Sequence, residues 1–228
     1  MKAYAAEMLG TFMLVFFGTG AVVTHNATGA VGLLGIALVF GLTVLTVIYA
    51  IGDISGAHLN PAVTIGLLTS RRIKAATVAP YVISQIVGGL LASVLLHVLF
   101  PADMGLGATL PGTGISPMTA FILEALLTFF LMFVILNVTT GAKEKGITAG
   151  VAISCVVVLE ILFAGPVTGA SMNPARSIGP AVVSGQLQHL WVYLTAPIVG
   201  AVAAGAVCGW MRQPAVVTTT QPAVLAEK

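Results

Sequence analysis

Asn60 and Asn173 are the polar residues whose type and setting first suggest chemistry in this chain. Each lies in the same local order, a glycine-containing entry, Asn-Pro-Ala and a short apolar run, in Ile54–Gly66 and, 113 positions later, in Val167–Gly179. Asparagine caps helix N-termini and proline suits the first helical position, so both stretches predict a helix that begins at the asparagine. The first, Asn60–Thr69, would be about 15 Å long, roughly half the hydrocarbon thickness of a bilayer.

The composition indicates an integral membrane protein. Of the residues, 58% are hydrophobic and 7% are charged, with a mean hydropathy of +1.07, whereas soluble domains carry about 25% charged residues. The net charge of +2 gives no indication of a nucleic-acid partner. Cys155 and Cys208 lie inside apolar runs, where packing explains them better than redox chemistry. Nothing in the sequence indicates a cofactor or a metal ion.

Six apolar runs have the length of a membrane span, so the predicted fold class is an all-α membrane protein. They are Ala3–Val23, Val31–Ile51, Ala76–Leu99, Met118–Val138, Ile147–Phe163 and Leu190–Met211.

The two asparagine stretches belong to an internal repeat. The residues around Glu7 in the first run resemble those around Glu124 in the fourth. Because each half holds three spans, the second half must enter the membrane inverted, as in transport proteins with broken helices. We predict one channel domain over residues 1–211, with repeats at 3–99 and 118–211, and a disordered cytoplasmic tail at 212–228.

The basic residues predict the orientation. With the N-terminus in the cytoplasm, eight of the nine Lys and Arg residues fall on the cytoplasmic side. They are Lys2, Arg71, Arg72, Lys74, Lys143, Lys145, Arg212 and Lys228. We therefore predict a multi-pass protein of the cytoplasmic or plasma membrane with both termini in the cytoplasm. The ninth, Arg176, follows the second Asn-Pro-Ala on the outer half, and this placement indicates a functional task rather than anchoring at the headgroups.

The stretches before the two short helices are predicted to be irregular backbone at membrane depth, which persists only in protein or beside a watery cavity. Their carbonyl groups would line a pore; the residues concerned are Gly56, Ala57 and His58 in one half and Gly169, Ala170 and Ser171 in the other. Each asparagine would cap its helix with its oxygen and leave its amide hydrogens free for the channel.

The small residues Ala62 and Ala175 would let the two helix starts touch. Their facing positive ends would exclude cations, including hydronium.

These motifs identify the chain as similar to the aquaporin (major intrinsic protein) superfamily, over Ala3 to about Met211. The segment Phe163–Ser177 is similar to the nodulin-26-like branch and its bacterial relatives. The resemblance implies six spans plus two half-helices, a homotetramer with one pore per subunit, and pore motifs formed by Asn60, Pro61, Ala62, Asn173, Pro174 and Ala175. It also implies an outer constriction, the selectivity filter, formed by Phe40, Ile161, Ala170 and Arg176.

The predicted filter is of intermediate width, apolar on one side and hydrogen-bonding on the other. Water-selective members of the family usually have His where this chain has Ile161, and plant nodulin-26-like channels commonly have Trp where it has Phe40. The other family markers disagree. Ser177, Ala181 and Tyr193 are similar to the residues of water channels at these positions, whereas Leu194 is similar to that of glycerol channels. The markers therefore do not decide the preferred permeant.

The ionisable and amide residues inside the predicted spans can have either a functional or a structural role. Glu7 and Glu124 could relay protons, but we favour bracing of the irregular loop in each half, with Gln85 in a similar role. His58 is also expected to brace its loop, since no second metal ligand is near it in sequence. Glu160 directly precedes Ile161 and should point about 100° away from the pore wall, to where it could hold an outer loop; the sequence does not assign its role.

Together these features predict a passive channel for water and small uncharged solutes, such as glycerol and metalloid acids, that excludes protons and ions. The first alternative is a secondary transporter, which also uses inverted repeats but needs coupling-ion carboxylates at the midplane. The second is a channel mainly for glycerol or metalloid acids rather than water. An enzyme is not expected, because the sequence carries no set of catalytic residues.

Overall fold

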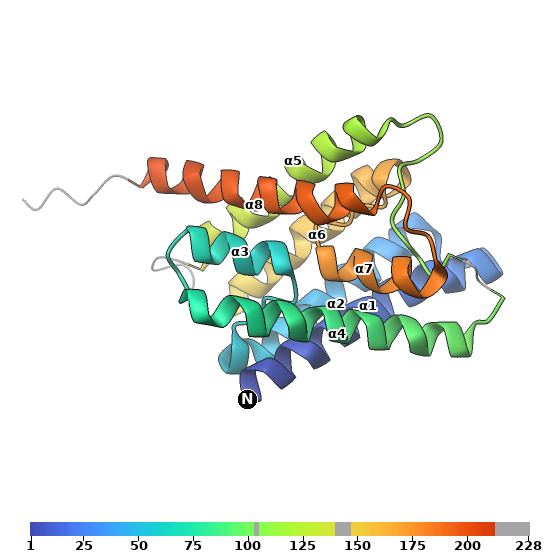
Figure 1. Cartoon of the computed structure of the whole chain (residues 1–228), viewed down its shortest axis with the longest axis horizontal. Helices are drawn as coiled ribbons and strands as arrows, with labels where there is room; N and C mark the ends of the chain where they lie inside the picture. Colours follow the sequence, from blue (N-terminus) through green and yellow to red (C-terminus); the bar gives the residue numbers. More distant parts are fainter. Residues whose placement is uncertain (103–104, 140–146, 213–228) are drawn as a thin grey trace, which may run out of the picture.

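The computed structural model describes residues 1–102, 105–139 and 147–212, which form eight helices (Figure 1). In chain order they are α1 (Lys2–Thr28), α2 (Gly32–Ser55), α3 (Pro61–Thr69), α4 (Ala75–Leu99), α5 (Pro117–Val138), α6 (Ile147–Thr168), α7 (Pro174–Ser184) and α8 (Leu190–Met211). The predicted tail after Arg212 and the basic residues Lys143, Lys145 and Lys228 lie outside the described residues.

Six of these helices are long and apolar enough to cross a membrane, and they are the six runs predicted from the sequence. The helix predicted to end at Phe163 continues through Pro166 to Thr168. Other ends shift by a few residues because local caps decide them. For example, α2 ends at Ser55, where Gly56 adopts a φ of 88° that terminates the helix.

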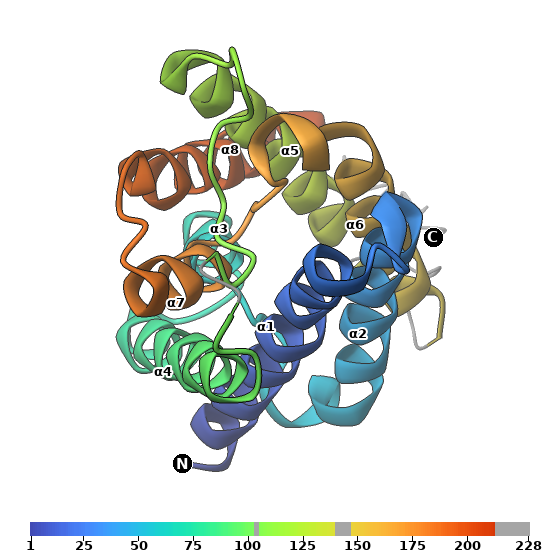
Figure 2. The ribbon, with the colours of Figure 1, turned by 90° about the vertical axis from the view of Figure 1, so that its right-hand side faces the viewer.

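The two halves of the chain pack in the same way. In the first half α1 packs along α4, and in the second half α5 packs along α8, while α2 and α6 meet across the halves. Figure 2, seen along the bundle, shows α3 and α7 at one side of it, between α4 and α8. The two short helices point their first residues toward each other near the middle of the bundle (Figure 1). The inverted repeat predicted from the sequence therefore has a direct structural counterpart.

Glycines make the close helix crossings possible. A Cβ at Gly88 of α4 would collide with the backbone carbonyl of Met8 in α1, and a Cβ at Gly200 of α8 would collide with that of Ala125 in α5. Small residues at crossing points are the usual means of tight packing in lipid, because no hydrophobic driving force acts between helices there.

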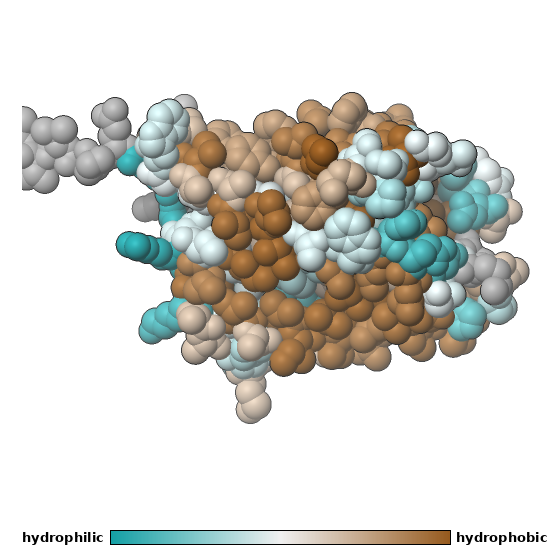
Figure 3. Space-filling view, turned by 45° about the horizontal axis from the view of Figure 1, so that its top comes forward, coloured by the Kyte–Doolittle hydropathy of each residue, from teal (hydrophilic) through white to brown (hydrophobic). Residues whose placement is uncertain are grey.

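The outer surface of the bundle is suited to a bilayer. Large apolar side chains such as Leu34, Ile83, Leu159 and Phe163 are more than half exposed. Figure 3 shows a broad apolar band on one face, with hydrophilic residues gathered toward the two ends. The chain is therefore a multi-pass membrane protein.

The glycine crossings yield a first prediction. Gly200→Ala should destabilise the protein by about 1–3 kcal/mol, because the added methyl group must displace the backbone of α5. The matched control is Gly209→Ala in the same helix, where a Cβ meets nothing within 4 Å. Thermal unfolding in detergent should show a lower Tm for Gly200→Ala alone. Equal shifts for both variants would contradict the packing account.

Candidate functional site

The two half-helices begin at Asn60 and Asn173, as the sequence predicted. The Asn60 side-chain oxygen accepts hydrogen bonds from the backbone N–H groups of Ala62 and Val63, at 2.8 and 3.4 Å. Asn173 caps the corresponding groups of α7 at 3.0 and 3.3 Å. The proline after each asparagine occupies the first helical position, where no N–H is needed.

The amide nitrogen of each asparagine reaches across to the other half. Asn60 Nδ2 donates to the Met172 carbonyl at 2.8 Å, and Asn173 Nδ2 donates to the Leu59 carbonyl at 2.9 Å. The expectation that all amide hydrogens are free for the channel was therefore wrong for one hydrogen of each side chain. Both carbonyls belong to residues with a φ of 55°, an unusual left-handed conformation that turns them toward the opposite half.

A buried glutamate holds the irregular backbone before α3. Glu7 is fully buried in α1 and accepts hydrogen bonds from the backbone N–H groups of His58 and Leu59 at 2.9 and 2.7 Å. It also accepts from the Ser55 hydroxyl at 2.7 Å and from Gln85 Nε2 at 2.8 Å. Four donors compensate the carboxylate, so this arrangement leaves no oxygen of Glu7 for proton relay.

Glu124 holds the second loop in the same manner. It is fully buried in α5 and accepts from the backbone N–H groups of Ser171 and Met172 at 2.9 and 2.8 Å. The Thr168 hydroxyl donates at 2.7 Å. The position that would match Gln85 is Pro197, so the second half lacks the amide donor found in the first.

In each half a tyrosine hydroxyl donates a further hydrogen bond to the residue before the irregular loop. The sequence did not point to these two tyrosine contacts. Tyr81 donates to the Ser55 carbonyl at 2.8 Å, and Tyr193 donates to the Thr168 carbonyl at 2.8 Å. Ser55 and Thr168 each stand directly before Gly-Ala, so the repeat alignment contained the signal for these positions.

His58 braces its loop within the same half. Its Nδ1 lies 3.2 Å from the Thr64 hydroxyl, and its ring lies 5.0 Å from that of Tyr81. The Thr64 hydroxyl in turn donates to the Asn60 carbonyl at 3.0 Å. These contacts agree with the structural role expected for His58.

A cavity of about 400 Å³ passes both asparagines. Its lining extends from Arg72 in the turn after α3 to Arg176 in α7. Five of the six residues predicted to line the pore with carbonyls belong to it, namely Gly56, Ala57, His58, Ala170 and Ser171. Gly169 does not line the cavity, because it closes α6 with a φ of 83° and packs against Thr109 instead. Thr139 and Ala149, which the sequence did not single out, line the cavity as well.

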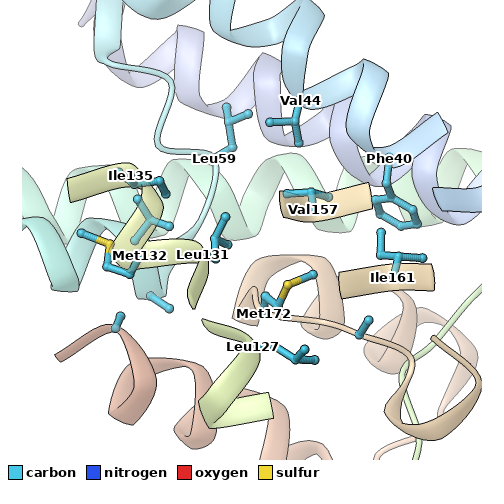
Figure 4. Packing of buried hydrophobic residues seen from close by; sticks show 14 of the residues in the cluster. Phe40, Val44, Leu59, Leu127, Leu131, Met132, Ile135, Val157, Ile161 and Met172 are labelled. Carbon is cyan, nitrogen blue, oxygen red and sulfur yellow. The ribbon is translucent and has the colours of Figure 1, made fainter. Parts of the chain in front are cut away.

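The four residues of the predicted filter meet at this cavity. Phe40, Ile161, Ala170 and Arg176 are all at least 95% buried, and all four line it. Arg176 Nη1 donates to the Gly107 carbonyl at 2.7 Å, and its guanidinium carbon lies 5.2 Å from the centre of the Phe40 ring. In Figure 4 Phe40 of α2 and Ile161 of α6 face each other.

Apolar side chains cover much of the remaining cavity wall. Figure 4 shows Val44, Val157, Leu131 and Met172 converging from α2, α6, α5 and the second loop. The wall therefore offers few side-chain hydrogen bonds, and backbone groups and the two asparagines supply most of the polarity.

Glu160 is the exception among the buried carboxyl groups. It is 2% exposed, and neither of its oxygens has a hydrogen-bond partner within the described residues. Its predicted direction would have allowed a contact with an outer loop, and the described residues show no such hydrogen bond. The sequence could not reveal this, because the angle from Ile161 fixes a direction but not a partner.

The asymmetric cavity, the crossed asparagines and the apolar exterior define a membrane channel built from two inverted halves. Residues 1–208 match the family described as Major intrinsic protein, so the chain belongs to that family. The family consists of channels rather than enzymes, and as a member of it the chain is a channel for water and small neutral solutes.

Several plant proteins are similar over most of the chain. Nodulin-26 of Glycine max is 44% identical over 206 residues, covering 89% of this chain and 75% of its own. Aquaporin NIP1-2 of Arabidopsis thaliana is 44% identical over 221 residues, covering 93% and 74%, and aquaporin NIP1-1 of Zea mays is 47% identical over 201 residues, covering 87% and 70%.

A solved structure supports the fold. The X-ray structure of the aquaglyceroporin from Plasmodium falciparum matches with a TM-score of 0.83 and 28% identity, covering 90% of this chain and 93% of that one. This similarity confirms the predicted fold class, and the plant proteins confirm the predicted likeness to the nodulin-26-like branch.

The unpartnered carboxyl of Glu160 yields a second prediction. Glu160→Leu should raise the free energy of unfolding by about 1–3 kcal/mol, a gain of about 2–12 °C in Tm, because it removes an unsatisfied polar group. Glu124→Leu is the matched contrast. It should lower the Tm, because three donors would lose their acceptor. A lower Tm for Glu160→Leu in detergent would show that its carboxyl has a partner.

Proposed function

We propose that the channel passes glycerol-sized polyols and metalloid acids as well as water. The observation that carries this proposal is the wall around Arg176, where Phe40, Ile161 and Ala170 are apolar and the guanidinium is the charged donor. A neutral solute with hydroxyl groups on one side and an apolar skeleton on the other fits such a wall. The similarity to a protein described as an aquaglyceroporin supports a passage of this width.

Arg176, Phe40, Ile161 and Ala170 form the selectivity filter in this proposal. Arg176 is held by the Gly107 carbonyl and lies over the Phe40 ring, so its charge faces the passage in a fixed orientation. A fixed cation repels cationic solutes and orients passing hydroxyl groups.

Asn60 and Asn173 form the central barrier to protons. The N-terminal ends of α3 and α7 place partial positive charge at the same level of the cavity. An amide group has two hydrogens, so each asparagine keeps one that its bond across the halves does not use. A water molecule that accepts hydrogen bonds from these amides would be oriented so that it cannot join the continuous hydrogen-bonded chain that proton hopping needs.

The bracing residues Glu7, Gln85 and Glu124 keep the two loops in place for this function. Because each carboxylate binds consecutive backbone N–H groups, loss of one would free a loop at membrane depth, where water cannot replace the bonds.

Family membership and charge support a proposal for the assembly and the orientation. We infer a homotetramer with one pore per subunit, in a cytoplasmic or plasma membrane, and treat residues 1–211 as one channel domain. The start of α1, the turn after α3 and the end of α8 lie at one end of the bundle (Figure 1). This end carries Lys2, Arg71, Arg72, Lys74 and Arg212, so the positive-inside rule supports cytoplasmic termini.

The proposal is tested by light scattering of proteoliposomes under osmotic steps of sucrose, glycerol and boric acid. Water efflux should be fast and proportional to the gradient, and re-swelling should follow in glycerol and in boric acid. Fluxes that saturate, or that need a proton or sodium gradient, would instead indicate a transporter. Vesicles that re-swell in neither solute would limit the channel to water.

Arg176→Val gives the third prediction. Removing the charge and the side-chain bulk from the filter should raise erythritol permeability by about tenfold. This factor corresponds to lowering the free-energy barrier to permeation by about 1.4 kcal/mol. A small cation leak should appear as well. Val63 occupies the equivalent position in the first half, so Val63→Ala is the control, with little change expected. If the Arg176→Val variant excludes erythritol as well as the parent does, Arg176 is not part of the filter.

Ile161→His gives the fourth prediction. Replacing this apolar side chain of the filter by a polar one should reduce glycerol permeability by about tenfold, because the hydrocarbon side of glycerol loses its contact surface. Water permeability should fall by less than about twofold. The ratio of the two, measured in the same vesicles, checks this. An equal loss of both permeabilities would count against the two-sided aperture.

A further inference from the structure

The segment Leu106–Gly112 between α4 and α5 belongs to the interior of the protein. Leu106 is fully buried and Thr109 is 3% exposed. A Cβ at Gly107 would lie 2.9 Å from Cβ of Thr19 in α1, and the Gly112 N–H donates to the Val167 carbonyl at 2.8 Å. Figure 2 shows this connection crossing the end of the bundle in front of α7. A connection that is packed on several helices acts as a structural element.

This segment contacts two consecutive residues of α7. The Gly107 carbonyl accepts from Arg176 Nη1 at 2.7 Å. Two residues further on, the Thr109 hydroxyl lies 2.7 Å from the Ser177 hydroxyl. One short segment therefore binds Arg176 through a backbone carbonyl and its neighbour Ser177 through a side-chain hydroxyl.

The second contact starts a chain of buried hydroxyl groups. Ser177 Oγ lies 2.5 Å from Ser171 Oγ, and Ser171 donates to the Asn173 carbonyl at 3.0 Å. A hydroxyl has a single proton, so this last bond requires Ser177 to donate to Ser171 and Thr109 to donate to Ser177. The Asn173 N–H donates back to Ser171 Oγ at 3.3 Å, which uses its remaining acceptor site.

In the first half the equivalent hydrogen bonds form between the helices themselves, without a connecting segment. Thr64 corresponds to Ser177, and its hydroxyl accepts from Gln85 Nε2 at 3.0 Å and donates to the Asn60 carbonyl. In the second half Pro197 stands in the place of Gln85, and the Thr109 hydroxyl is the donor that reaches Ser177 instead. Within the described residues, the link to a connecting segment is found at the end that carries Arg176.

We propose that Thr109 is a positioning residue of the selectivity filter. By donating to Ser177, its hydroxyl fixes the segment that presents the Gly107 carbonyl to Arg176. The guanidinium is then held above the Phe40 ring in one orientation. Without that hydroxyl, the arginine has access to other rotamers and the size limit of the aperture becomes less sharp. This inference rests on the proposed role of Arg176 as part of the filter.

The test is the ratio of erythritol to water permeability in proteoliposomes. Thr109→Val keeps the shape of the side chain and removes the hydroxyl. The ratio should rise by about three- to tenfold, because a lost buried hydrogen bond changes an equilibrium by about that factor. Thr109→Ser restores the donor and should return the ratio to within about twofold of the parent. Thr113→Val is the matched control, an exposed threonine in the same connection that should leave the ratio unchanged.

The ratio is independent of the number of active channels, so a simple loss of folded protein would not move it. A parental ratio in Thr109→Val would overturn the proposal, as would a raised ratio that Thr109→Ser does not correct. If Thr109→Val yields no protein, Ser177→Ala interrupts the same chain and should raise the ratio likewise; a parental ratio there would also overturn it. A raised ratio in Arg176→Val with a parental one in Thr109→Val refutes this inference alone, whereas parental ratios in both refute the filter itself.

Discussion

The need to satisfy backbone N–H groups at membrane depth is the constraint on which this structure depends. Both half-helices are entered by irregular backbone, and lipid offers that backbone no hydrogen-bond partners. Glu7 and Glu124 supply the acceptors, and each binds two consecutive N–H groups of its own loop. A carboxylate is suited to this task because its two oxygens accept several bonds at once. The loops can then place Asn60 and Asn173 where each bonds the opposite half.

The same bonds explain why the pore is symmetric at its centre and asymmetric at one end. The glutamate, tyrosine and asparagine contacts recur in both halves with nearly equal distances. The symmetry breaks where Val63 of α3 corresponds to Arg176 of α7, and where Pro197 replaces the donor Gln85. In the function we propose, selectivity is added at one end of a centre that both halves build alike.

The sequence predicted much of the fold because its signals are local. Spanning length identifies six helices, and Asn-Pro marks the start of the two short ones. The four filter residues, which the resemblance to the aquaporin family implied, also meet at one cavity.

The contacts that the sequence could not reveal depend on tertiary geometry. The bond from Asn60 to the Met172 carbonyl joins residues 112 positions apart. It also needs a left-handed backbone conformation at Met172, which the residue type does not predict. The turn of Gly169 away from the cavity and the unpartnered carboxyl of Glu160 are of the same kind. Side-chain direction and the identity of a distant partner decide them, and periodicity carries information on neither.

The central claim is that the crossed asparagines and facing helix starts let water through and stop protons. The most direct measurement records water efflux by light scattering and proton entry by an entrapped pH dye in the same proteoliposomes, under an imposed membrane potential. The account predicts water permeability well above that of protein-free vesicles, with proton entry equal to theirs. Proton entry that rises in proportion to the water permeability as more protein is reconstituted would contradict it.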